Sequence, residues 1–67
     1  ALTPRQRTAF EFIAAYIEAT GSAPTIVEVR AALGNKSKGS THRIVSAIVD
    51  RGYLKRLPRQ ARALALV

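Results

Sequence analysis

The chain has 67 residues and carries 11 Lys and Arg against four Asp and Glu, which gives a formal net charge of +7. A chain of this length forms one small domain and buries only about 60% of the surface that its unfolded form exposes. It contains no cysteine and one histidine, His42, which excludes a disulfide framework and a multi-histidine metal cluster. No run approaches the ~20 apolar residues of a membrane span and no secretory signal opens the sequence, so we expect a cytoplasmic protein that does not bind a membrane.

The positive charge lies in the second half of the chain. Residues 1–35 carry three basic and three acidic side chains, whereas residues 36–67 carry eight basic side chains and one acidic side chain, Asp50. A surface whose charge only keeps a protein soluble usually mixes both signs, and a one-sided basic half is typical of a domain that binds a polyanion. The charge distribution therefore favours nucleic acid as the partner.

The first helical signals stand at the N-terminus. Thr3 is expected as the N-cap, Pro4 at the first helical position, and Gln6 as the residue that closes a capping box. Apolar residues then recur at helical spacing until Gly21, which is a natural stop. This pattern predicts a helix over residues 4–20. Its apolar face is formed by Ala9, Phe10, Phe12, Ile13, Ala14, Tyr16 and Ile17.

Two shorter helices follow. Thr25 and Glu28 form a second capping box, which predicts a helix over residues 26–33. Ser37 is the next candidate cap and predicts a third helix over residues 38–51. Two short helices joined by a turn that contains glycine form the helix-turn-helix pattern. The stripes expected in the core are Ile26, Val29 and Leu33 in the second helix and Thr41, Val45 and Ile48 in the third.

After the third helix the period of the sequence changes. Residues 53–57 favour a strand, residues 58–61 favour a turn, and residues 62–67 alternate large and small apolar side chains. We therefore predict a two-stranded hairpin over residues 53–67 with a basic tip. The fold class is then mainly α with a small β-hairpin (α+β), a three-helix winged helix-turn-helix that spans residues 1–67.

The outward face of the third helix is the first candidate site. A recognition helix buries one stripe and presents short polar and basic side chains to the major groove near its N-terminal end. Arg43 can read guanine through two hydrogen bonds, Gly39 permits close approach of the backbone, and His42 is either a donor to DNA or a solvated side chain. The residues expected to face the bases are Ser37, Gly39, Ser40, His42, Arg43 and Ser46.

A second set of residues is expected to contact phosphates. A basic loop between two strands can lie along a phosphate backbone or reach into a minor groove. The amide groups that open the second helix form a generic anion site. The residues of this set are Thr25, Lys36, Lys38, Lys55, Arg56, Arg59, Gln60 and Arg62.

The sequence shows no pattern typical of catalysis. No nucleophile is paired with a base, and Glu11, Glu18 and Glu28 are expected to act as solvating charges. We therefore expect no enzyme activity, no metal and no cofactor. Two alternatives to DNA binding stay open, a winged-helix protein-interaction module and an RNA-binding winged helix. The second is weakened because Tyr53 is the one aromatic residue left over from the expected core, and single-stranded bases need aromatic platforms.

Four short motifs are spread along the chain: Leu2-Thr3-x-Arg5-Gln6, Gly21-x-x-Pro24-Thr25, Ala32-Leu33-Gly34 with Ser37, and Gly52 before the hairpin. Together they resemble the N-terminal DNA-binding domain of the LexA repressor family. The resemblance implies a bacterial or phage repressor that binds a two-fold operator on double-stranded DNA and controls genes of the DNA-damage (SOS) response.

The same resemblance implies which residues contact bases and how the protein assembles. It assigns base contacts to Ser37, Gly39, Ser40, His42 and Arg43. Many members of the family carry Asn and acidic residues in this stretch, so the operator sequence stays open. LexA-like proteins also have a C-terminal self-cleavage and dimerisation domain. We therefore expect this chain alone to be a monomer, and to dimerise on DNA or through such a domain.

Overall fold

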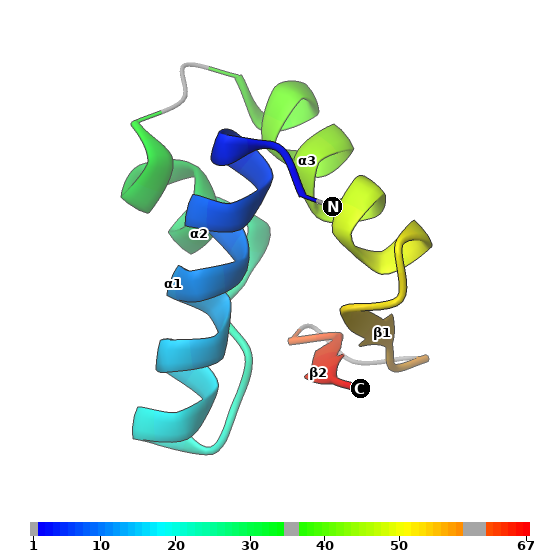
Figure 1. Ribbon diagram of the computed structural model, residues 1–67. Helices are drawn as coiled ribbons and strands as arrows, with labels where there is room; N and C mark the ends of the chain where they lie inside the picture. Colours follow the sequence, from blue (N-terminus) through cyan, green and yellow to red (C-terminus); the bar gives the residue numbers. More distant parts are fainter. Residues whose placement is uncertain (1, 35–36, 59–61) are drawn as a thin grey trace.

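The computed structural model describes residues 2–34, 37–58 and 62–67. Every pair of helices is in contact and the hairpin packs on α3 through β1, which confirms the predicted winged helix-turn-helix (Figure 1). No helix in the described part of the chain is long and apolar enough to cross a membrane. The elements are α1 (Pro4–Thr20), α2 (Ile26–Leu33), α3 (Lys38–Asp50), β1 (Leu54–Arg56) and β2 (Leu64–Leu66).

All three helices begin at the predicted caps. The Thr3 hydroxyl accepts the Gln6 N–H at 3.2 Å, and the Gln6 side chain accepts the Thr3 N–H at 3.1 Å. Thr25 and Glu28 form the same reciprocal pair at α2, and Ser37 caps α3 with its side chain. Each box satisfies two backbone donors that the helix leaves without an internal partner. The helix starts are therefore fixed by local hydrogen bonds.

The ends of the helices also follow local chemistry. Gly21 ends α1 with φ 80° and Gly34 ends α2 with φ 68°. Residues with a Cβ rarely adopt this left-handed conformation, so glycine is favoured at both positions. The third helix, predicted to reach residue 51, ends one residue earlier at Asp50 with Arg51 as its C-cap. Such a shift lies within the usual variation of helix ends.

One core joins the helices to the hairpin. Ile13 and Val29 are fully buried in α1 and α2, and Leu54 and Leu64 bring one side chain from each strand into the same cluster. The predicted stripe of α3 is confirmed, because it has no exposed surface. Since that stripe faces the core, the opposite face of α3 is left to solvent. The stripe consists of Thr41, Val45 and Ile48.

The hairpin is short and antiparallel. Leu54 is paired with Leu66, and Arg56 is paired with Leu64. Side chains of paired residues share one face of a sheet, so the buried leucines lie on the face toward the helices. The predicted tip at residues 59–61 lies outside the described residues.

Candidate nucleic-acid interface

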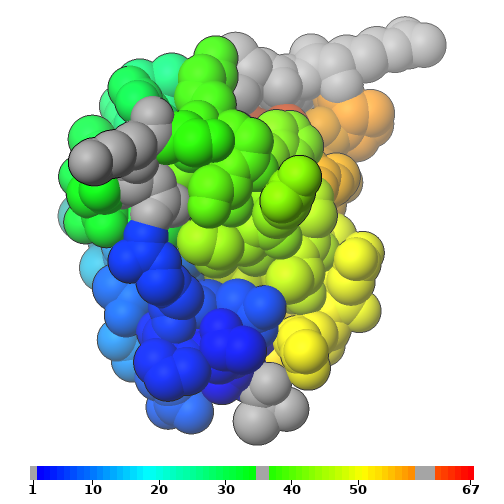
Figure 2. Space-filling model, turned by 90° about the horizontal axis from the view of Figure 1, so that it is seen from above, coloured from blue at the N-terminus to red at the C-terminus, as the bar shows by residue number. Residues whose placement is uncertain are grey.

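The first two turns of α3 form an exposed face. Figure 2 shows this part of α3, in lime, at the centre of one side of the molecule, beside the start of α1 in blue and the end of β1 in orange. The exposed residues here are all sequence-predicted site residues: Ser37, Lys38, Gly39, Ser40, His42 and Arg43.

This region of the chain is strongly basic. Between residues 37 and 58, the exposed charged side chains are five basic residues and the single acid Asp50. Positive potential over such a surface attracts a polyanion and raises its association rate. The basic residues are Lys38, Arg43, Arg51, Lys55 and Arg56.

Ser46 and Arg56 join α3 to β1. The Arg56 Nη2 donates a hydrogen bond of 2.7 Å to the Oγ of the half-buried Ser46. The sequence predicts a separate DNA contact for each of the two residues. The structure brings them together, so the outward side of α3 continues into β1, where Lys55 is also exposed.

The start of α2 already holds an anionic side chain. The Thr25 N–H donates to Glu28 Oε1 at 2.8 Å, and the Thr25 hydroxyl accepts the Glu28 N–H at 3.2 Å. The carboxylate of Glu28 thus lies where the sequence predicts a bound phosphate. Thr25 is half-buried in this capping box.

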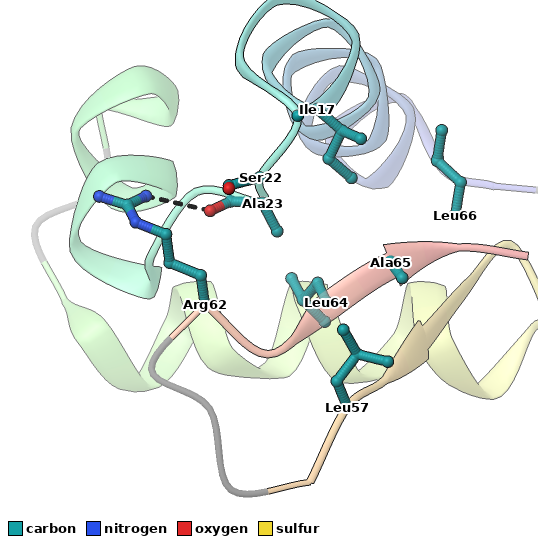
Figure 3. A pocket seen from close by; sticks show the side chains of 9 residues that line it. Ile17, Ser22, Ala23, Leu57, Arg62, Leu64, Ala65 and Leu66 are labelled. Atoms are coloured by element: carbon teal, nitrogen blue, oxygen red, sulfur yellow. Dashed lines mark hydrogen bonds between the residues drawn. The ribbon is translucent and has the colours of Figure 1, made fainter.

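Arg62 lies in an ion-pair cluster on the body of the domain. Its Nη1 donates to Glu28 Oε1 at 2.6 Å and its Nη2 donates to Oε2 at 3.3 Å. The same Nη1 lies 3.0 Å from the carbonyl oxygen of Ala23, a bond drawn in Figure 3, and 3.3 Å from the hydroxyl of Tyr16. The guanidinium carbon is 5.8 Å from the centroid of the Tyr16 ring.

The cluster changes the interpretation of two predicted residues. The solvating role expected for Glu28 is wrong, because its carboxylate is held between Arg62 and the N-terminus of α2. Arg62, expected with the phosphate-contacting residues, has four acceptor atoms within the domain. The capping box was visible in the sequence, but 34 residues separate Glu28 from Arg62 and no local pattern links them.

The ion pair shifts the pKa of both partners. The hydrogen bond from Arg62 and the backbone N–H of Thr25 hold the pKa of Glu28 at about 2, below its ordinary value of 4.5. The carboxylate in turn raises the pKa of Arg62. Both groups are therefore charged at neutral pH.

Three predicted site residues, Lys36, Arg59 and Gln60, lie outside the described residues. In the ranges that the structure does describe, no group of three His, Cys, Asp or Glu side chains could hold a metal ion.

A three-helix fold whose third helix turns an exposed basic face to solvent beside a hairpin defines a winged helix-turn-helix of the kind used by DNA-binding proteins. The model of the family "LexA DNA binding domain" matches residues 1–63. The chain therefore belongs to the LexA DNA-binding domain family, as its motifs indicated.

Similar proteins include LexA repressors of three bacteria. This chain is 42% identical over 66 residues to the LexA repressor of Erythrobacter litoralis, and 41% identical over 66 residues to those of Novosphingobium aromaticivorans and Rhodospirillum rubrum. Each comparison covers 98% of this chain. The chain spans 28%, 28% and 26% of the length of these three relatives.

Proposed function

We propose that this chain is the operator-binding module of a LexA-like transcriptional repressor and that α3 enters the major groove of double-stranded DNA. Membership of the LexA DNA-binding domain family supports DNA binding. The observation that carries the groove assignment is the division of α3 into a fully buried stripe and an exposed polar and basic face. A recognition helix needs this division because its base-reading side chains must be free of the core.

Arg43 is the residue we propose for specific base reading. It is exposed near the N-terminal end of α3, and a guanidinium can donate two hydrogen bonds to the O6 and N7 of guanine. Gly39 is proposed to let the helix backbone come close to the groove. The shorter donors Ser37, Ser40 and His42 complete the base-facing set.

The hairpin is proposed to lie along the phosphate backbone or to enter the minor groove. Lys55 and Arg56 are exposed on β1, and the bond from Arg56 to α3 supports a single surface made of both elements. Further phosphate contacts are proposed for Lys36, Lys38, Arg59 and Gln60.

The relatives named above are repressors, and we propose the same role here. Two copies of the module would occupy the two halves of a symmetric operator in the bacterial or phage cytoplasm. The genes under control are proposed to be those of the DNA-damage response.

Selection of bound sites from random duplex DNA tests the proposal. The expected result is enrichment of one short motif, with binding that weakens with salt by a log–log slope of about −0.9 for each phosphate neutralised. Failure to bind any duplex at low salt would refute the proposal and favour a protein-interaction module. A preference for single-stranded RNA over duplex DNA would favour the RNA-binding alternative.

A further inference from the structure

We propose that Arg62 and Glu28 are positioning residues for DNA binding: their ion pair sets the orientation of the hairpin, and with it the basic residues of β1, relative to α3. The inference rests on the proposed function, because it concerns how the same DNA-binding surface is held in place.

The hairpin needs ties to the helices to have a defined orientation. Each strand has three residues, and an isolated two-stranded hairpin is marginally stable at best in water. Leu54 and Leu64 anchor it in the core, and Arg56 ties β1 to α3. Arg62, two residues before β2, provides the polar tie to α2.

The side chain of Arg62 bridges one end of a groove on the surface of the domain. A groove of about 210 Å³ separates β2 from the loop that follows α1, with Ile17, Ala23 and Leu64 among its lining residues. Figure 3 shows Arg62 at one end of this groove, reaching across it to the Ala23 carbonyl. Leu64 and Ala23 both belong to the buried core, and the polar bridge from Arg62 adds a directional contact between the hairpin and the helices at that end of the groove.

The geometry of the Glu28–Arg62 pair is suited to fixing the orientation of the hairpin rather than to raising the free energy of unfolding. Both carboxylate oxygens of Glu28 accept from Arg62, and bidentate pairs of this kind add directional specificity. The Tyr16 hydroxyl donates to Glu28 Oε2 at 3.3 Å and so holds the carboxylate from a third side. The two charged side chains are 41% and 36% exposed, and ion pairs this open to solvent contribute little to the free energy of unfolding.

A direct phosphate contact by Arg62 and a positioning role predict opposite effects when the charge of Glu28 is removed. If Arg62 binds phosphate, neutralising Glu28 frees its guanidinium and raises the net positive charge, so duplex binding tightens. If the pair positions the hairpin, the same change weakens duplex binding even though the net charge becomes more positive. The sign of the effect therefore separates the two roles.

The main variant is Glu28→Gln in the 67-residue chain. Gln preserves the capping box, because Gln6 fills the same position in the box of α1. We expect its affinity to fall about tenfold for the selected duplex and for random duplex alike, within the range of couplings between contacting residues. Arg62→Gln should show a similar loss, and the double variant should bind no more weakly than either single variant. The salt slope should become less negative by about 0.9 for each phosphate that the displaced hairpin no longer neutralises.

Two further variants separate orientation from charge and from folding. Glu18→Gln removes the same charge from an exposed position of α1 and is expected to bind at least as tightly as the unmodified chain. Tyr16→Phe removes the hydroxyl bonded to both partners without changing charge, and we expect about a twofold loss, at the weak end of such couplings. It tests the proposal independently if Glu28→Gln does not fold. In DNA-free Glu28→Gln, the amide resonances of Lys55 and Arg56 should move, which reports the changed hairpin orientation.

Tighter binding by Glu28→Gln with weaker binding by Arg62→Gln would assign Arg62 to a direct phosphate contact and overturn the proposal. Unchanged binding in both variants would overturn it as well, while leaving the operator-binding function intact. Absence of duplex binding by the unmodified chain would refute the proposed function itself and the positioning role with it.

Discussion

The guanidinium of Arg56 lies 2.7 Å from the hydroxyl of Ser46, and this hydrogen bond links the hairpin to the helix proposed to read DNA. Ser46 lies on α3 and Arg56 lies on β1, so either side chain can be replaced without altering the backbone of the other element. Arg56→Ala is expected to weaken binding to all duplexes alike and to make the salt slope less negative by about 0.9, the value for one phosphate contact.

Ser46→Ala should keep the salt slope and lower duplex affinity by about 0.5–1.5 kcal/mol, the usual net contribution of one hydrogen bond. Fluorescence anisotropy of a labelled duplex over a series of salt concentrations measures both quantities. An unchanged slope in Arg56→Ala would contradict a phosphate contact by this residue.

Arg43→Ala tests base reading. The loss should be about 1–3 kcal/mol at the selected site, with relaxed selectivity at one base position, because a bidentate contact to guanine disappears. Ser40→Ala, on the same exposed face, should cost less. Repeating the site selection with each variant measures the change in specificity. If Arg43→Ala weakened selected and random DNA equally, Arg43 would be only a phosphate anchor.

Gly39→Ala should affect stability and DNA binding in opposite directions. A Cβ at Gly39 would meet the Ser37 Oγ at 3.5 Å, which is ordinary van der Waals contact, so the fold can accept it. Alanine in a helix is favoured over glycine by roughly 0.5–1 kcal/mol, so the free energy of unfolding should rise. Duplex affinity should fall because the added methyl group keeps the helix away from the groove. Chemical denaturation and duplex titration measure the two effects, and a stabilised variant with unchanged affinity would remove Gly39 from the interface.

Acid should destabilise the domain through Glu28. Its pKa is about 2 in the folded chain against an ordinary 4.5, so the unfolded state binds more protons between these values. The stabilisation from the ionised carboxylate is complete above pH 4.5, declines as the pH falls, and is lost below about pH 2. Because the pair is open to solvent, the decline should be small; urea unfolding at a series of acidic pH values should show it, and Glu28→Gln should lack it. Glu18→Gln serves as the control and should follow the unmodified chain; a Glu28→Gln variant with the same pH dependence would contradict the prediction.

The chain should be a monomer in the absence of DNA. Among the described residues, the exposed large apolar side chains are Val27, Tyr53 and Val67, and scattered residues of this kind do not make an interface. An obligate dimer buries about 1,000 Å² or more on each partner, roughly a quarter of the 4303 Å² surface here. Sedimentation at micromolar concentration should give one species of 7.2 kDa. A stable dimer without DNA would reveal an interface that the apolar surface does not suggest.

The helices and the exposed face of α3 could be predicted from the sequence because their causes are local. A capping box acts over three residues, as between Thr3 and Gln6, so its pattern is legible in the chain itself. The helical period likewise links the burial of Val45 and Ile48 to the exposure of Arg43. The distribution of charge predicted a basic second half of the chain that binds nucleic acid, and the motifs indicated the LexA family.

Only the tertiary structure decided which partners Arg56 and Arg62 have within the domain. The sequence presents Arg62 as one more basic residue of the hairpin, and its partners Tyr16, Ala23 and Glu28 stand 34 to 46 residues earlier in the chain. The hydrogen bond between Arg56 and Ser46 likewise joins residues ten positions apart, with the end of α3 between them. Contacts between residues so far apart leave no periodicity or spacing to read, because the distance between them is set only when the hairpin packs back onto the helices.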